Sequence, residues 1–172
     1  KNTNICRRYS RRSTACMIQK KLESVKKIAD THVTRIQDAL EHLKTTFPVT
    51  EHSVQKLAGQ EFLYMKLLTN RFSKLQDHLG ANVFDLFFLL NSENIDSMTM
   101  IDKLNKLEKL GIIEDVHIWH DMRTARNIIA HEYPDNPALI ANTLNAIKTY
   151  CPILIAIKNA LFKRMQSSNN VT

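Results

Sequence analysis

Apolar residues recur every three or four positions along most of this chain, the spacing of a helix with one buried face. The first pattern spans 17–44, with apolar positions Ile18, Leu22, Val25, Ile28, Ala29, Val33, Ile36, Leu40 and Leu43. A second pattern spans 51–79 and is followed by Gly80, a residue type that often caps the end of a helix. We therefore predict two long amphipathic helices joined by a connection at 45–50.

Two shorter helices are predicted next. Residues 82–90 are almost entirely apolar, which favours a short buried helix, and the polar residues 92–97 are typical of a loop. Residues 99–110 repeat leucine and isoleucine at helical spacing, and Gly111 is expected to end that helix.

The last part of the chain predicts two further long helices. Asp115 is a suitable N-cap for a helix that reaches about Tyr133. Asn136 as N-cap and Pro137 at the first position predict the start of the closing helix, which Pro152 should kink. The sequence shows no strand-like alternation and no glycine-rich phosphate loop. We therefore expect an all-α protein, an antiparallel bundle of four long helices plus short ones.

The chain length and composition indicate a single domain. Its 172 residues are 44% hydrophobic, which is enough for a sizeable core, and its three glycines and four prolines argue against a turn-rich β fold. We assign residues 17–166 to the helical bundle, residues 1–16 to a basic flexible leader and residues 167–172 to a frayed tail.

The net charge of +7 is concentrated at one end. Residues 1–16 hold five of the 24 basic residues and no acid, which leaves 19 basic and 17 acidic residues in the rest of the chain. Attraction of nucleic acid by the bundle must therefore come from a local patch. The leader itself either binds phosphate backbones or is an unstructured segment before Met17, and we favour the second interpretation.

The sequence favours a cytoplasmic location without a membrane anchor. No secretory signal is visible, and the apolar run at 153–157 lies between Lys148 and Lys158. The three cysteines are Cys6, Cys16 and Cys151. Their odd number and wide spacing predict neither a disulfide framework nor a zinc site, and His117 and His120 lack a third metal ligand.

The most informative segment is 126–133, which carries four chemically active side chains within about two helical turns. The polar residues on and just before it are His120, Arg123, Arg126, Asn127, His131 and Tyr133. Residues three or four apart lie on the same side of a helix, so His120, Arg123, Asn127 and His131 form a polar stripe that Arg126 flanks, and Tyr133 lies in the last turn. The other side of the helix is apolar, with Trp119, Met122 and Ile129.

Arginine and histidine together suit phosphodiester cleavage without a metal. A guanidinium binds phosphate through paired hydrogen bonds, and an imidazole transfers protons near neutral pH. The alternative interpretation is an ordinary solvated surface, in which His131 interacts with the helix C-terminus and Tyr133 is a half-buried anchor.

The string Arg-Asn-x-x-x-His-x-Tyr resembles the signature of HEPN domains, and specifically of HepT-like toxins that are paired with MNT-type minimal nucleotidyltransferases. Here its fixed positions are Arg126, Asn127, His131 and Tyr133, and the resemblance covers about 17–165. It implies an all-α homodimer in which two motif helices meet around a two-fold axis. It also implies an endoribonuclease that needs no cofactor or metal.

The resemblance implies a role for each residue of the string. His131 activates the ribose 2′-hydroxyl or protonates the leaving oxygen, and Arg126 stabilises the phosphate in the transition state. Asn127, supported by Arg123, orients phosphate or His131. The partner nucleotidyltransferase, acting as antitoxin, transfers AMP to Tyr133, and the bulky anion then blocks the cleft.

Two other functions compete with the ribonuclease. One is a non-catalytic subunit that binds a nucleotide or substrate for a nucleotidyltransferase. The other is a helical dimerisation protein in which the motif has no chemical role.

Overall fold

A computed structural model describes the backbone of residues 3–91, 93–130 and 136–169, and the side chains of these ranges between residues 17 and 167. The helices are α1 (Thr3–His42), α2 (Glu51–Gln55), α3 (Gly59–His78), the π-helical segment η1 (Leu79–Val83), α4 (Phe84–Leu90), α5 (Met100–Lys109), α6 (Val116–Ala130) and α7 (Pro137–Asn169). The described ranges contain no strand, so the predicted all-α class is confirmed.

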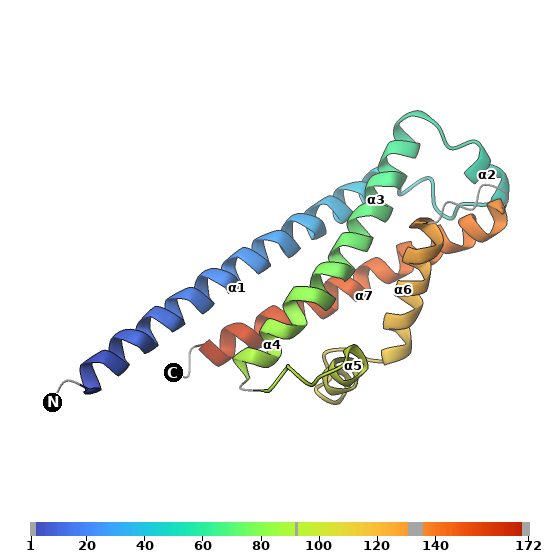
Figure 1. Cartoon of the computed structure of the whole chain (residues 1–172). Helices are drawn as coiled ribbons and strands as arrows, with labels where there is room; N and C mark the ends of the chain where they lie inside the picture. Colours follow the sequence, from blue (N-terminus) through green and yellow to red (C-terminus); the bar gives the residue numbers. More distant parts are fainter. Residues whose placement is uncertain (1–2, 92, 131–135, 170–172) are drawn as a thin grey trace.

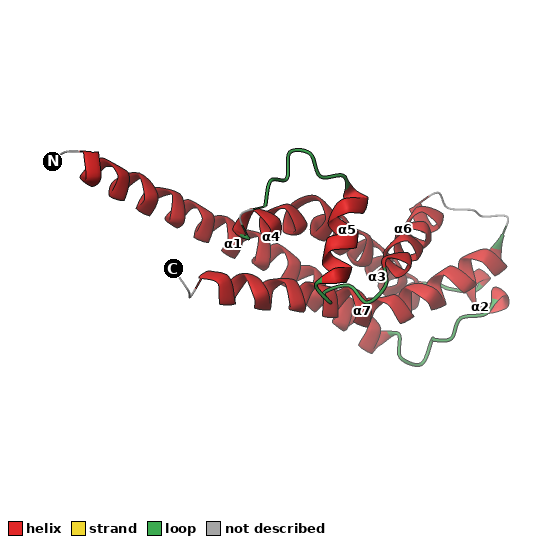
Figure 2. Ribbon diagram, turned by 90° about the horizontal axis from the view of Figure 1, so that it is seen from below, coloured by secondary structure: helices red, strands yellow, loops and turns green. Residues whose placement is uncertain are grey.

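The long helices are packed side by side along one axis. Figure 1 shows α1 running in one direction and α3 and α7 returning. The start of α1 and the end of α7 lie at the same end of the molecule in both views (Figure 1 and Figure 2). The motif helix α6 packs mainly against α7 and also contacts α3 and α5, and α3 in turn contacts α1 and α7.

The core is formed by the apolar positions that the sequence pattern marks. Its largest fully buried side chains include Phe72, Phe84, Phe88, Ile36, Leu43, Leu68, Leu75, Leu104, Leu107 and Met122. Ile18 and Ile28 depart from the pattern, because they are 36% and 44% exposed. Single exposed apolar residues are common at the edges of an amphipathic face and leave the core continuous.

Helix α1 begins earlier than the sequence predicts. It starts at Thr3, so the backbone of most of the basic leader is helical and continuous with the bundle helix. The physical reason is the absence of glycine and proline between residues 1 and 47, since only these residues strongly interrupt an established helix.

The predicted helix at 51–79 is in fact divided. Thr50 caps α2 by accepting a hydrogen bond from the Ser53 amide, and α2 ends at Gln55. Gly59 then has a φ of +57°, a left-handed conformation that favours glycine, and α3 runs on from it. The preceding connection is held to α7, because Asn145 exchanges hydrogen bonds of 2.9 and 2.8 Å with the backbone of Val49.

Gly80 is not a helix cap, and that prediction was wrong. It lies in η1, which continues α3 directly into α4, so the predicted helix at 82–90 is the end of one long helical rod. A Cβ at Gly80 would lie 3.5 Å from Cζ2 of Trp119 and 3.4 Å from Cε of Met100. Glycine is used here for close packing rather than for chain reversal.

Two other predicted helix ends are confirmed. Gly111 has a φ of +66°, and its amide and that of Ile112 donate to the carbonyls of Glu108 and Leu107, a Schellman motif that ends α5. The Asp115 carboxylate accepts from the His117 amide at the start of α6.

The closing helix α7 also starts where the sequence predicts. Asn136 accepts a hydrogen bond from the Leu139 amide, and Pro137 is the first residue of the helix. Pro152 lies within α7, which continues beyond it to Asn169. Cys151 is fully buried, and burial raises the pKa of its thiol to about 12, so it is a protonated core residue.

Helix α7 is attached to α1 by an ion pair. The almost buried ammonium of Lys158 pairs with Asp30, which also binds Lys26 at 2.7 Å. Burial alone would raise the pKa of Asp30, but its hydrogen bonds to the two lysines lower the pKa below its ordinary value. By length and composition alone α7 is apolar enough to cross a membrane, a test that the core helix of a soluble protein also passes.

The close packing at Gly80 predicts opposite effects of two substitutions. Gly80→Ala should raise the free energy of unfolding by roughly 0.5–1 kcal/mol, because the position is helical and a methyl group fits at ordinary contact distance. Gly80→Leu should lower it by roughly 1–3 kcal/mol, because the longer side chain must displace Trp119. Urea unfolding followed by circular dichroism measures both.

The control is Gly59→Ala, which should be destabilising because of the positive φ at Gly59. A Gly80→Leu protein as stable as the parent would show that the seam between η1 and Trp119 is not tightly packed.

Candidate functional site

Helix α6 presents the two-sided character that the sequence predicts. Trp119, Met122 and Ala125 are buried against the bundle, whereas Arg123 and Asn127 are exposed. Trp119 is 4% exposed and packs against Phe84 with ring centroids 4.9 Å apart. It is therefore a core residue, and the polar stripe of α6 faces outward.

Arg126 is the best positioned polar residue of the motif. Its side chain is 23% exposed, and its guanidinium forms an ion pair with Asp77 on α3. The side-chain oxygen of Asn127 accepts two further hydrogen bonds, at 3.3 Å from Nε and 3.1 Å from Nη2 of Arg126. Asp77 on α3 and Asn127 on α6 thus fix the plane of the guanidinium. The guanidinium is therefore already oriented to form paired hydrogen bonds with an anion.

A polar pocket of about 200 Å³ lies beside Arg126, between α3 with η1 and α6. It is lined by Gln76, Asp77, Gly80, Ala81, Met100, Trp119, Arg123 and Arg126. Two guanidiniums and one carboxylate therefore border a small concave surface, whose apolar part comes from Met100 and Trp119. Such an arrangement suits a phosphate next to a sugar or a base.

Gln76 adds a buried polar group to this pocket. It is 3% exposed, and its Nε2 donates to the backbone oxygen of Trp119 at 3.2 Å. Its Oε1 is buried and accepts no hydrogen bond from any residue that the structure describes. A buried acceptor without a donor costs about 1–3 kcal/mol, so a ligand N–H or O–H that reaches Oε1 would be favoured there.

The structure brings together three of the five site residues predicted from the sequence. Arg123 and Arg126 line the polar pocket, and Asn127 binds Arg126 rather than standing alone. His131 and Tyr133 lie outside the described residues. Asp77 and Gln76 were not predicted, because helical spacing gives the face of a residue but not the helix it meets.

Clusters of metal-ligating side chains are a further kind of candidate site. Among the residues that the structure describes, no group of three or more histidine, cysteine, aspartate or glutamate side chains is placed to hold a metal ion. The pair His117 and His120 therefore gains no third ligand within the described ranges.

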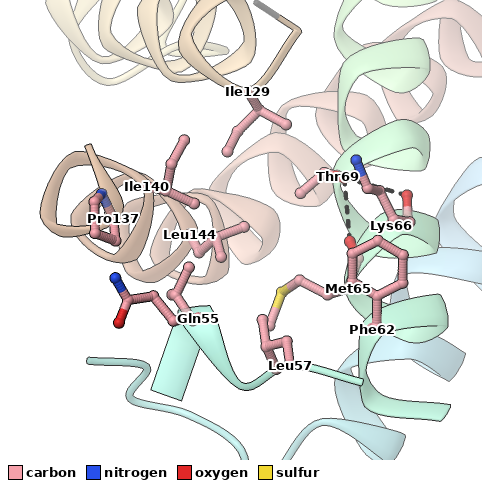
Figure 3. Close-up of a pocket in the computed structure, with 11 residues that line it drawn as sticks. Gln55, Leu57, Phe62, Met65, Lys66, Thr69, Ile129, Pro137, Ile140 and Leu144 are labelled. Carbon is pink, nitrogen blue, oxygen red and sulfur yellow. Dashed lines mark hydrogen bonds between the residues drawn. The ribbon is translucent and has the colours of Figure 1, made fainter. Parts of the chain in front are cut away.

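A second cavity is a different kind of site. It has a volume of about 450 Å³ and lies between the α2–α3 region, the last described turn of α6 and the start of α7. Figure 3 shows Leu57, Phe62, Met65, Ile140 and Leu144 around it, with Gln55 and Lys66 as polar residues of its lining. Its mainly apolar walls would not stabilise phosphate, so the polar pocket beside Arg126 is the candidate functional site.

Comparison of the chain with protein-family models, curated proteins and solved structures finds no match.

The pairing of Arg126 with Asp77 predicts that Asp77→Asn strengthens anion binding at this pocket. The Asp77 carboxylate competes with an anion for Arg126 and repels it by about 1 kcal/mol. Without this carboxylate the affinity for tripolyphosphate should therefore rise about fivefold. The chemical shift of the Arg126 Nε–H group in NMR spectra, followed during titration at low salt, reports this pocket alone.

Asp121→Asn is the matched control, since Asp121 is an exposed carboxylate of α6 that does not line this pocket. Equal or weaker binding by the Asp77→Asn protein would contradict the competition between Asp77 and an anion.

Proposed function

We propose that this chain is a HEPN-type endoribonuclease, the toxin of a toxin–antitoxin pair, and that it cleaves RNA without a metal. One observation carries the proposal: the guanidinium of the motif residue Arg126 is preset by Asp77 and Asn127 at the border of a polar pocket. A second guanidinium, that of Arg123, borders the same pocket.

Binding of RNA would begin with an exchange of partners at Arg126. Asp77 is 60% exposed, and an ion pair so accessible to water is worth about 0–1 kcal/mol. A phosphodiester that also contacts Arg123 gains charge-assisted hydrogen bonds to two guanidiniums, each stronger than a neutral bond. The exchange therefore favours phosphate and leaves Arg126 oriented by Asn127.

The chemical step would use His131, which follows the last described residue of α6 in the sequence. As a base, its imidazole takes the proton of the ribose 2′-hydroxyl, whose oxygen attacks the phosphorus while the P–O5′ bond breaks. A second imidazole, from the homodimer partner, protonates the leaving 5′-oxygen. The products would be a 2′,3′-cyclic phosphate and a free 5′-hydroxyl, and Arg126 would stabilise the charge of the transition state.

The runner-up function is a nucleotide-binding subunit of a nucleotidyltransferase, without cleavage. The unpartnered Oε1 of Gln76 supports it, because an acceptor in a pocket bordered by two guanidiniums can recognise a nucleoside hydroxyl or amino group. Both functions use the same pocket, so only a measurement of RNA cleavage distinguishes them.

The catalytic proposal predicts that Arg126→Ala and His131→Ala each reduce cleavage strongly. The purified protein, incubated with total RNA in the presence of a chelator, should yield fragments with 2′,3′-cyclic phosphate ends. Loss of the guanidinium should lower the rate about 10²- to 10³-fold, and loss of the imidazole about 10²- to 10⁴-fold. Fragment ends are mapped by sequencing, and size-exclusion chromatography with light scattering tests the dimer.

The matched controls are Arg35→Ala and His52→Ala, exposed residues of the same types on α1 and α2, which should cleave at the parental rate. Intact RNA in every reaction, together with tight nucleotide binding by the parent protein, would refute the ribonuclease and favour the binding subunit.

The toxin–antitoxin proposal makes Tyr133 the acceptor of AMP from an MNT-type nucleotidyltransferase. Attaching an anionic nucleotide near Arg126 and His131 in the sequence should neutralise phosphate-binding charge and block the cleft. Tyr133→Phe should therefore leave growth arrest intact but prevent rescue by the transferase. Mass spectrometry detects the added AMP, and labelling that persists in the Tyr133→Phe protein would place the modification elsewhere.

A further inference from the structure

A second group of cationic and titratable side chains lies between α1 and α3, away from the polar pocket. It consists of His32 on α1 and of Arg71, Lys74 and His78 on α3, and we call it the seam cluster. The rings of His32 and His78 meet edge to face with centroids 6.4 Å apart. Arg71, Lys74 and His78 are spaced by three and four residues, so they share one side of α3.

The seam cluster holds two polar atoms with unmet hydrogen-bonding capacity. Nδ1 of His32 and Nε of Arg71 are buried, and neither has a partner among the residues that the structure describes. Within the same residues, no carboxylate forms an ion pair with Arg71 or Lys74, because the neighbouring acid Asp77 pairs with Arg126. The cluster therefore concentrates positive charge and buried hydrogen-bond capacity without an internal anion.

The pKa of the His32 imidazole reflects that excess of positive charge. His78 donates from Nε2 to the Val25 carbonyl at 2.9 Å, and its Nδ1 faces the Asn82 amide at 3.4 Å. The pKa of His32 lies below its ordinary value, first because of burial and then because of repulsion from Arg71, His78 and Lys74. An anion in the seam cluster would reverse the second effect and raise the pKa of His32.

We propose that the seam cluster is a binding site for a phosphate group. A guanidinium and an ammonium on one helix face supply directed hydrogen bonds and a point charge, the combination that recognises phosphate in proteins. A metal cation does not fit, since Arg71 and Lys74 repel it and His78 already donates from Nε2. The phosphate comes either from the backbone of an RNA strand or from a free phosphate ion, and the same side chains bind both.

This site is separate from the pocket beside Arg126. Successive helical residues turn by about 100°, which places Gln76 roughly 150° around α3 from Arg71 and His78. Lys74 lies only about 60° from Asp77 around α3, so it is the residue of the seam cluster nearest to the polar pocket. Arg71 and His78 lie on the far side of α3 from Gln76, and phosphate binding in the seam cluster does not depend on RNA cleavage at Arg126.

The test follows the ring signals of His32 and His78 by NMR in the full chain at constant, low ionic strength. One arm adds inorganic phosphate, and the other adds a short 2′-O-methyl RNA that cannot be cleaved through its 2′-oxygen. Either ligand should raise the pKa of His32 in the parent protein. A response to phosphate alone identifies the free ion as the source, and a response to the oligonucleotide identifies the strand.

The variants are Arg71→Gln with Lys74→Gln, and Lys74→Gln alone, which keeps the half-buried Arg71 in place and should fold normally. The double variant should bind at least about tenfold more weakly and the single variant about threefold to tenfold more weakly. Lys20→Gln with Lys21→Gln removes the same charge from an exposed part of α1 and should bind like the parent. The proposal is overturned if His32 responds to neither ligand, if polyglutamate causes the same response as phosphate, or if the Lys74→Gln protein binds like the parent.

Discussion

The position of the motif helix depends on the close packing of Trp119 against η1. No side chain much larger than a methyl group fits at position 80, so the small residue Gly80 lets the indole approach the rod formed by α3 and α4. Gln76 fixes the same turn of α6 by donating to the Trp119 carbonyl. A helix held at one turn has its following turns placed by its own geometry. Arg123 and Arg126, one and two turns further along α6, are therefore brought to the polar pocket and, for Arg126, to Asp77.

The same rod also separates two charged regions on a body that is nearly neutral. On α3, Asp77 balances Arg126, whereas Arg71 and Lys74 have no acidic partner among the described residues. Since the bundle carries little net charge, attraction of a polyanion must depend on such local arrangements rather than on a long-range field. Helix α3, which contacts the motif helix, thus carries the residues that set the local charge both at the polar pocket and in the seam cluster.

Much of the fold follows from local patterns, and the site follows from them only in part. Capping by Asp115 and Asn136 and termination at Gly111 are local events, so the sequence predicts them correctly. Gly80 was misassigned because a glycine that ends a helix and one that admits a neighbouring ring look alike in a sequence. Asp77 was missed for a related reason: its partner Arg126 is 49 residues away, and only tertiary packing brings the two together.

The two partners of Arg126 have different physical roles, and the difference explains how one site can be both ordered and available. Asp77 carries charge and is well exposed, so its pairing is weak and is readily exchanged for that of a phosphate. Asn127 carries no charge and adjoins Arg126 on the same helix, and its two hydrogen bonds use Nε and one hydrogen of Nη2, which leaves the Nη1–Nη2 edge of the guanidinium for an incoming anion. If Asn127 were a second carboxylate, the exchange would have to overcome two negative charges. A neutral amide at this position keeps the guanidinium oriented before and after the exchange, which is the property that a phosphate-binding arginine requires.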